Sequence, residues 1–188
     1  MIKLLVGLGN PGQQYEKTRH NAGFLFLDHL MDSKGGGWSV SQQFQGQVAN
    51  ISVAGMRLDM LKPMTFMNKS GLSVGKMLRY YKLKPEELLV VHDELELPEG
   101  VVKMKRDGGH AGHNGLRDII AHIDTRDFFR LRIGIGRPAM GANVADYVLS
   151  KPSAQGFSLL DAAFSLLEGH IESLAAADIS MINDRLAR

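Results

Sequence analysis

The hydrophobic residues of the chain follow two patterns that alternate along its length. Continuous aliphatic runs bounded by glycine or polar residues are typical of buried strands, and they occur at 2–8, 88–91 and 129–135. Three further stretches read as strands, 44–53, 56–61 and 101–105, and Ala54-Gly55 joins the first two as a strand pair. Apolar residues at helical spacing predict helices at 21–32, 67–81 and about 113–123, and a mostly helical segment from Ser153 onward.

Strands that alternate with helices indicate an α/β fold. We expect a single three-layer α/β/α domain over residues 1–188, with a twisted mixed sheet flanked by helices. Asn68 or Ser70 is expected to cap the helix at 67–81. Ligands in such sheets bind beyond the carboxyl ends of the strands. Asn10 follows the first strand and Asp93 ends the fourth, so both fall where chemistry is expected.

Composition narrows the class of protein. The 188 residues are 44% hydrophobic and 22% charged, the balance of an ordinary globular protein. No apolar run is long enough to span a bilayer and no signal peptide is recognised, so we expect a cytoplasmic protein without a membrane partner. The absence of cysteine excludes disulfides and thiolate metal sites. No exposed heptad or apolar edge stands out, so a monomer is expected.

Basic residues cluster although the net charge is only +2. The segment 103–137 contains eight basic residues and only four aspartates. The basic residues are Lys103, Lys105, Arg106, Arg117, Arg126, Arg130, Arg132 and Arg137. Such a cluster is either a solvated surface or a site for an anionic polymer, because phosphates are held by grouped Lys and Arg rather than by net charge. With only 7% aromatic residues, recognition of helix shape and phosphates fits better than stacking on single-stranded bases.

Three short motifs offer competing functions. Gly7-x-Gly9-x-x-Gly12 matches the dinucleotide fingerprint, with Asp28 near the spacing of the ribose-binding acid, but no amphipathic helix follows Gly12. The stretch 71–75 matches the nucleophile elbow GxSxG, but Ser73 falls within a helical pattern instead of a strand-to-helix turn. His110 and His113, near His92 and Asp93, raise the possibility of a metal. Their glycine-rich loop fixes no third ligand, so we expect neither a metal nor an organic cofactor.

A set of polar residues at strand ends and helix starts remains: Asn10, His20, Asn68, Asp93, His113 and Asn114. A histidine paired with a carboxylate is a common general base near neutral pH, since the carboxylate fixes its tautomer and stabilises the imidazolium. Asparagine amides both donate and accept, so they suit a peptide backbone, a water or an oxyanion. With no activated serine or cysteine, water would be the nucleophile.

Four stretches of the chain resemble bacterial-type peptidyl-tRNA hydrolase, and the resemblance runs from Lys3 to the C-terminal helices. They are VGLGNPG (6–12), YEKTRHNAGFLFLD (15–28), KPMTFMNKSG (62–71) with VVHDELELPEG (90–100), and GGHAGHNGLRDI (108–119). The second and fourth are long, with rare residues at fixed spacing. One local departure is Arg106-Asp107, which stands before Gly108 in the glycine loop and bears on the mobility of the loop or on its phosphate contacts.

The resemblance implies hydrolysis of the ester that joins a peptide to the 3′ ribose of tRNA. His20 would activate water, Asp93 would hold and polarise His20, and Asn10 would help to read the blocked α-amino group. Asn68 and Asn114 would bind substrate and steady the water or oxyanion. Other family positions are matched by the cleft residues Tyr15, Phe66, Met67 and His113, by the phosphate-facing residues Lys103, Lys105 and Arg132, and by the mobile lid at 136–150.

Two alternatives stay open at the level of sequence. One is a serine hydrolase that uses Ser73, with Asp93 and a histidine following in the chain order of α/β-hydrolases. The other is a non-catalytic RNA-binding module built on the basic cluster, although binding alone gives no reason for Asn10, His20 and Asp93.

Overall fold

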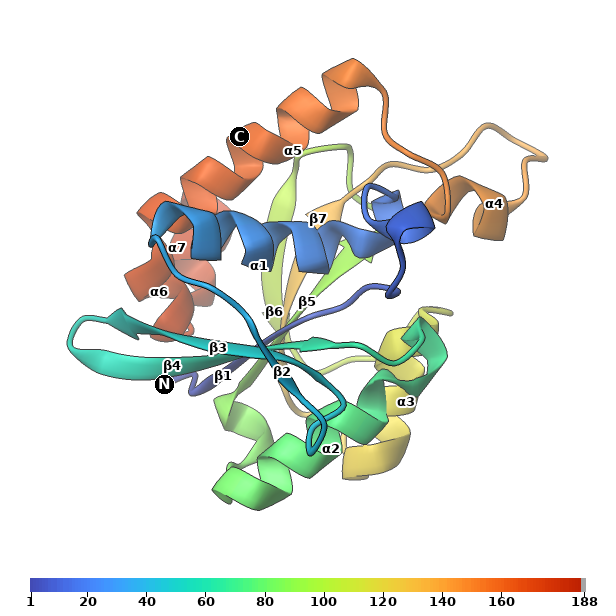
Figure 1. Cartoon of the computed structure of the whole chain (residues 1–188). Helices are drawn as coiled ribbons and strands as arrows, with labels where there is room; N and C mark the ends of the chain where they lie inside the picture. The colour runs from blue at the N-terminus through green and yellow to red at the C-terminus, as the bar shows by residue number, and fades with distance from the viewer. Residues whose placement is uncertain (187–188) are drawn as a thin grey trace.

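Seven strands form one mixed sheet in the computed structural model, which describes residues 1–186 (Figure 1). Their order across the sheet is β2-β3-β4-β1-β5-β7-β6. β4, β1, β5 and β7 run parallel in the centre, while β2, β3 and β6 pair antiparallel. The strands are β1 (Leu4–Gly7), β2 (Ser39–Ser41), β3 (Gly46–Val53), β4 (Met56–Pro63), β5 (Leu88–Glu94), β6 (Val102–Arg106) and β7 (Phe129–Gly134).

Helices cover both faces of the sheet, which confirms the three-layer α/β/α arrangement (Figure 1). α1 (Ala22–Ser33) and α5 (Ala154–Gly169) pack on one face, and α2 (Ser70–Tyr81) and α3 (Asn114–Ile123) on the other. The remaining helical segments are α4 (Val144–Val148), α6 (Ile171–Ala175), α7 (Ile179–Leu186) and the 3₁₀ turns η1 (Gln13–Tyr15), η2 (Arg19–Asn21), η3 (Met67–Lys69) and η4 (Pro85–Glu87). None of the helices in residues 1–186 has the length and hydrophobicity of a membrane-spanning segment.

Two hydrophobic clusters, one on each face, explain why the central strands are continuously apolar. Along β5, Leu88 and Val90 point into the cluster under α2 and α3, while Leu89 and Val91 point into the cluster under α1 and α5. Side chains alternate between the faces of a strand, so a strand that is buried on both sides needs apolar residues at every position.

Glycine allows α1 to lie directly against the strand backbones. A Cβ on Gly23 would come within 2.4 Å of both the Leu8 amide nitrogen and the Val91 carbonyl oxygen. The Phe24 amide donates to the Leu8 carbonyl at 3.3 Å, and the Leu8 amide donates to the Val91 carbonyl at 3.0 Å. This close approach places η2, just before α1, beside the carboxyl ends of β1 and β5.

The elements differ from the sequence predictions at a few boundaries. β2 was not predicted, so the strand that ends at Asp93 and Glu94 is the fifth of the sheet and not the fourth. The predicted caps were wrong: α2 follows directly on η3, its N-cap is Lys69 without a side-chain bond, and the Ser70 hydroxyl donates back to the Met67 carbonyl at 2.8 Å.

The structure removes the support for two of the competing motifs. Gly12 has φ 114° and is followed by η1, not by a helix that could receive a pyrophosphate, and Asp28 forms an ion pair with Lys62. Ser73 is completely buried in α2, where its hydroxyl donates to the Gln45 carbonyl at 3.1 Å. A serine in that position is not a nucleophile, so the serine-hydrolase alternative is wrong.

Candidate active site

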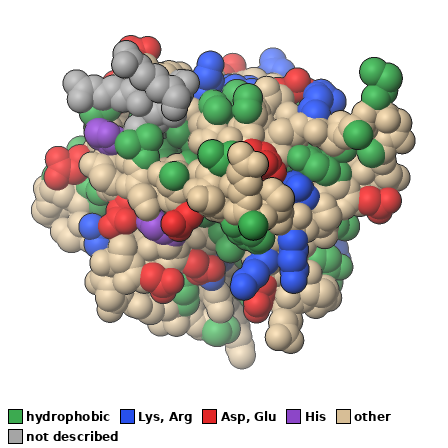
Figure 2. All heavy atoms as spheres, turned by 90° about the horizontal axis from the view of Figure 1, so that it is seen from above, with side chains coloured by type: hydrophobic (Ala, Val, Ile, Leu, Met, Phe, Trp, Pro, Cys, Tyr) green, Lys and Arg blue, Asp and Glu red, His purple; other side chains and the backbone are tan. Residues whose placement is uncertain are grey.

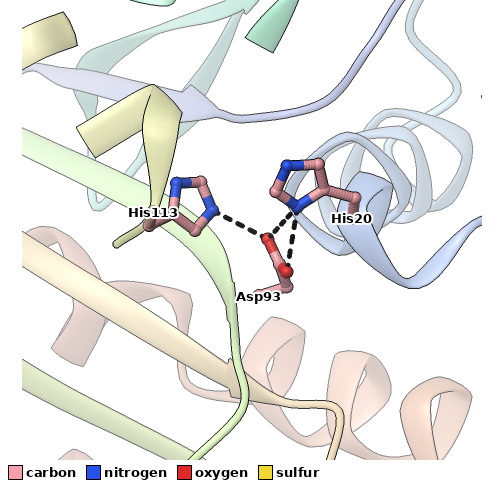
Figure 3. Close-up of side chains that lie close together, drawn as sticks. All are labelled: His20, Asp93 and His113. Carbon is pink, nitrogen blue, oxygen red and sulfur yellow. Dashed lines mark hydrogen bonds and ion pairs between the residues drawn. The ribbon is translucent and has the colours of Figure 1, made fainter. Parts of the chain in front are cut away.

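Two histidines converge on the carboxylate of Asp93 at the end of β5 (Figure 3). His20 Nδ1 lies 3.0 Å from both carboxylate oxygens, and His113 Nε2 lies 2.8 Å from Oδ1. Asp93 is buried, whereas the His20 side chain is 13% exposed. His20 comes from η2 and His113 is the N-cap of α3, so the group joins three segments far apart in sequence.

The hydrogen bonds determine where the imidazole protons lie. A carboxylate only accepts, so His20 Nδ1–H and His113 Nε2–H both donate to Asp93. His113 Nδ1 then accepts from the Leu116 amide at 3.4 Å, as a neutral ring requires. In neutral His20 the lone pair is left on Nε2, which points away from Asp93 in Figure 3.

Charge and burial oppose each other at this group. Burial lowers the pKa of His20, but the charge of Asp93 and the hydrogen bond to it outweigh burial and raise that pKa above its ordinary value. Burial alone would raise the pKa of Asp93. The nearby His20 and His113 instead hold it well below its usual range, so Asp93 stays ionised.

Asn10 is fixed by two further contacts that leave part of its side chain free. Asn21 clamps the Asn10 backbone with both ends of its amide: Oδ1 accepts from the Asn10 amide at 2.9 Å and Nδ2 donates to the Asn10 carbonyl at 3.0 Å. Asn10 Oδ1 accepts from the Met67 amide at 2.7 Å. Its Nδ2 donates no hydrogen bond to any residue in 1–186 and is therefore available as a donor.

A cavity of about 720 Å³ lies over these groups and gathers most of the predicted site residues. Its lining includes all six polar residues of the predicted set together with Phe66, Met67 and Lys105. Three predicted residues are not in the lining: Tyr15, Lys103 and Arg132. Tyr15 lies in η1, where its carbonyl accepts from the backbone amide and the hydroxyl of Thr18, so the structure does not place it in the cleft wall.

The predicted lid forms one wall of the cavity and is tied to the residue before His20. Val144, Ala145, Val148 and Leu149 line the cavity from α4 and its end. Arg19 Nη1 donates to the Ser150 hydroxyl at 2.6 Å and to the Lys151 carbonyl at 2.9 Å, and its guanidinium lies 4.2 Å from the centre of the Tyr147 ring. The C-terminal end of segment 136–150 is therefore bonded to η2 through Arg19.

The basic cluster is partly neutralised by carboxylates. Arg132 pairs with Glu94, with 2.5 Å between Nη2 and Oε1, and Arg137 pairs with Glu96. Arg106, the local departure from the family pattern, forms two bonds to Asp127 at 2.5 and 2.7 Å. Lys105 forms no ion pair within the described chain and lines the cavity; burial and the charges of Arg130 and Arg132 lower its pKa.

The three residues of Figure 3 are also the group in the described chain whose ligand atoms lie close enough for a metal, within 4.8 Å of one another. His110 is not in this group; its Nδ1 accepts from the Gly112 amide. In the tautomers given above, both ring nitrogens that face Asp93 donate protons to it, so these contacts do not require a metal. The expectation of a site without metal stays a prediction.

Sequence reasoning missed two residues that shape the site, Asn21 and Arg130. The sequence predicts Asn21 only as the first residue of a helix, whereas in the structure its side chain binds the backbone of Asn10. Arg130 alternates with hydrophobic residues in FRLRIG, a pattern that indicates a solvent-facing side chain, yet it is completely buried.

Comparison with known proteins assigns the chain to a family. A family model described as peptidyl-tRNA hydrolase matches residues 4–188. A peptidyl-tRNA hydrolase of Dichelobacter nodosus is 49% identical over 174 residues, 93% of this chain and 92% of that protein. One from Methylococcus capsulatus is 48% identical over 186 residues, 99% of each chain. The chain belongs to the peptidyl-tRNA hydrolase family.

The solved structures agree with this assignment. The peptidyl-tRNA hydrolase of Acinetobacter baumannii is 41% identical and superposes with a TM-score of 0.92, over 99% of this chain and 94% of that one. Membership in the peptidyl-tRNA hydrolase family makes the chain a hydrolase of ester bonds. The alternative of a non-catalytic RNA-binding module is therefore wrong.

Asp93→Asn should lower the pKa of His20, because a neutral amide no longer stabilises the imidazolium while burial still disfavours it. Titration of the imidazole signals by NMR measures this directly. Glu94→Gln is the matched control, since it removes a negative charge one residue further along β5, where Arg132 is the partner. The assignment of Asp93 fails if its variant leaves the pKa of His20 unchanged, or if both variants lower it equally.

Proposed function

We propose that the cavity hydrolyses the ester between the peptide and the 3′ ribose of tRNA in peptidyl-tRNA, releasing both products and recycling tRNA after premature drop-off or stalled translation. Water is the nucleophile, His20 is its general base, and Asp93 orients His20. The enzyme would act as a cytoplasmic monomer without a metal or an organic cofactor. Membership in the peptidyl-tRNA hydrolase family supports the substrate.

The observation that carries this mechanism is the His20–Asp93 pair at the cavity wall. Donation from Nδ1 to Asp93 leaves the Nε2 lone pair free to take a proton from water. Asp93 then stabilises the imidazolium as it forms, in the way the carboxylate of a catalytic triad does. Since the neutral ring is the base, hydrolysis should rise with pH through the pKa of His20.

Three asparagines supply donors where the ester carbonyl would lie. Asn10 presents its free Nδ2, because Oδ1 is held by the Met67 amide. A donor at this position suits a carbonyl of the peptide, which fits recognition of a blocked α-amino group, since the blocking acyl group adds such a carbonyl. Asn68 and Asn114 line the same cavity with exposed side chains and would bind the substrate and the oxyanion.

The walls of the cavity suit the remaining parts of the substrate. Phe66 and Met67 would contact the peptide or the terminal nucleotide, and His113 supports the floor through Asp93. Segment 136–150 would act as the lid, with its apolar residues closing over the ester and its base held by Arg19. Tyr15 would contribute only if the substrate extends past the cavity toward η1.

The acceptor stem would bind along β6 and β7. Lys103 and Lys105 pair in register with Arg132 and Arg130, so the four side chains share the sheet face that carries α2 and α3. The face seen in Figure 2 instead intersperses Lys and Arg with Asp and Glu and shows no continuous basic surface. Lys103, Lys105 and Arg132 are the proposed phosphate ligands, and Lys105 is the one among them that lines the cavity.

His20→Ala should abolish hydrolysis while substrate binding survives, since a general base contributes roughly 10²–10⁴-fold to the rate. Release of free tRNA from peptidyl-tRNA, with aminoacyl-tRNA as the uncleaved comparison, measures it. Ser73→Ala is the control and should keep nearly the wild-type rate. The Gln45 carbonyl would retain its bond from the Met64 amide at 3.0 Å. An active His20→Ala enzyme contradicts the mechanism.

Lys105→Ala should raise KM for peptidyl-tRNA and leave kcat almost unchanged, because stem phosphates are remote from the ester and are bound equally in ground and transition states. The salt dependence of binding should flatten by about one unit of slope for each phosphate that the variant no longer binds. Arg132→Ala should have a smaller effect, since Glu94 already neutralises Arg132.

A peptide ester on a short CCA fragment, which has no stem, is the control substrate for these phosphate ligands. Wild type and the Lys105→Ala/Arg132→Ala double variant should cleave it alike. A decrease of kcat on both substrates, or a wild-type KM on full-length tRNA, would show that these residues do not bind stem phosphates.

A further inference from the structure

Arg130 is a buried cation without a carboxylate partner. Its side chain has no solvent-exposed surface although it borders the cavity, and its guanidinium lies 4.7 Å from the centre of the Phe128 ring. It forms no ion pair within residues 1–186, although a guanidinium stays protonated even where burial lowers its pKa, as it does here. Burying an unpaired charge is costly, so retaining one in the core calls for a reason.

The Arg130 guanidinium donates its hydrogen bonds to the glycine loop, residues 107–112. Nη1 donates to the Gly109 carbonyl at 2.6 Å and Nη2 donates to the Gly108 carbonyl. A planar fork of this kind sets the orientation of two neighbouring peptide groups, which a flexible lysine does not. Because both Nη groups are bonded and the residue is buried, Arg130 is not placed to contact a tRNA phosphate.

The loop has little structure of its own to hold its shape. It lies outside any helix or strand, and four of its residues have positive φ: Asp107, Gly108, Ala111 and Gly112. Three hydrogen bonds connect the loop to β7 and to Phe128, the residue just before β7. Two come from the Arg130 guanidinium, and the third runs from the Asp107 amide to the Phe128 carbonyl at 3.1 Å. Removing Arg130 would therefore free most of the loop from the sheet.

The loop ends at His113, so its position reaches the reacting group. Gly109, His110, Ala111 and Gly112 line the cavity, and the His113 amide donates to the His110 carbonyl at 2.9 Å. His113 in turn bonds Asp93, which bonds His20. A chain of direct contacts thus connects Arg130 to the proposed base.

We propose that Arg130 is a positioning residue for hydrolysis: it holds the glycine loop against β7, so that His113 keeps its bond to Asp93 and the cavity keeps its wall. This inference rests on the proposed function for its kinetic consequence. Its structural consequence, a fixed His113, does not depend on any substrate.

Two substitutions separate the fork from its charge. Arg130→Lys keeps the positive charge but removes the planar pair of Nη donors. Arg130→Met keeps much of the side-chain length but removes both the charge and the donors. Arg57→Met is the matched control, because Arg57 is an exposed strand arginine on β4 paired with Asp59. Both Arg130 variants should lower kcat by roughly 10- to 100-fold, as misplacement of a distant support does, with KM within about threefold of wild type.

Amide hydrogen exchange at His113 reports on the loop without substrate, and should quicken by about tenfold or more in both Arg130 variants but not in Arg57→Met. Guanidinium ion added to Arg130→Ala should restore part of kcat by re-forming the fork. A raised KM with unchanged kcat would show Arg130 to be a phosphate ligand, and unchanged His113 exchange would overturn the positioning role.

If Arg130→Met fails to fold, Arg130→Lys and the guanidinium rescue decide the question. Failure of wild-type enzyme to cleave peptidyl-tRNA would count against the proposed function alone, because the exchange result at His113 stands apart from it.

Discussion

The site depends on one buried carboxylate. Asp93 ends β5 inside the protein, and an ionised carboxylate in that position needs donors for its lone pairs. His20 and His113 are those donors, and they come from opposite layers of the fold: η2 precedes α1 on one face of the sheet, and α3 lies on the other. Because the buried Asp93 carboxylate is bonded by one donor from each layer, it connects the two layers at the carboxyl edge of the sheet.

The surrounding contacts serve to keep these donors in place. Gly23 lets α1 approach the strand backbones closely enough to deliver His20. Asn21 bonds the backbone of Asn10, and Asn10 in turn accepts from the Met67 amide. Asn21, the residue after His20, therefore also helps to fix the part of the cavity wall that Asn10 and Met67 form. Arg19 performs a similar task for the segment that would form the lid. Three consecutive residues, 19–21, thus contact three different walls of one site.

Much of this was accessible from the sequence, because hydrophobic periodicity reports burial. The central strands and the main helices follow from it, as does the location of Asn10 and Asp93 at the carboxyl edge. β2 was not predicted, because its three residues are largely exposed at the sheet edge and carry no apolar pattern. The pairing of His20 with Asp93 came from the family resemblance, since periodicity does not measure distance between remote segments.

The residues that were missed share a physical reason. Arg130 looks like a surface residue because alternation counts only its own strand, whereas the glycine loop that covers it comes from elsewhere in the chain. Asn21 binds the backbone of Asn10, and a backbone partner leaves no signature in the sequence. The sequence predicts Arg132 as a member of the basic cluster, but its ion pair with Glu94 depends on the register of neighbouring strands, which the sequence does not show.

The central claim is that Asp93 fixes His20 with its proton on Nδ1 and its lone pair on Nε2. Long-range ¹⁵N–¹H correlation of the imidazole rings in ¹⁵N-labelled protein, recorded above the pKa of His20, measures this tautomer directly. The account predicts a protonated Nδ1 and a bare Nε2 in His20, and the reverse tautomer in His113. A His20 ring protonated on Nε2 would contradict the account, because the nitrogen facing the cavity would then have no lone pair to accept a proton from water.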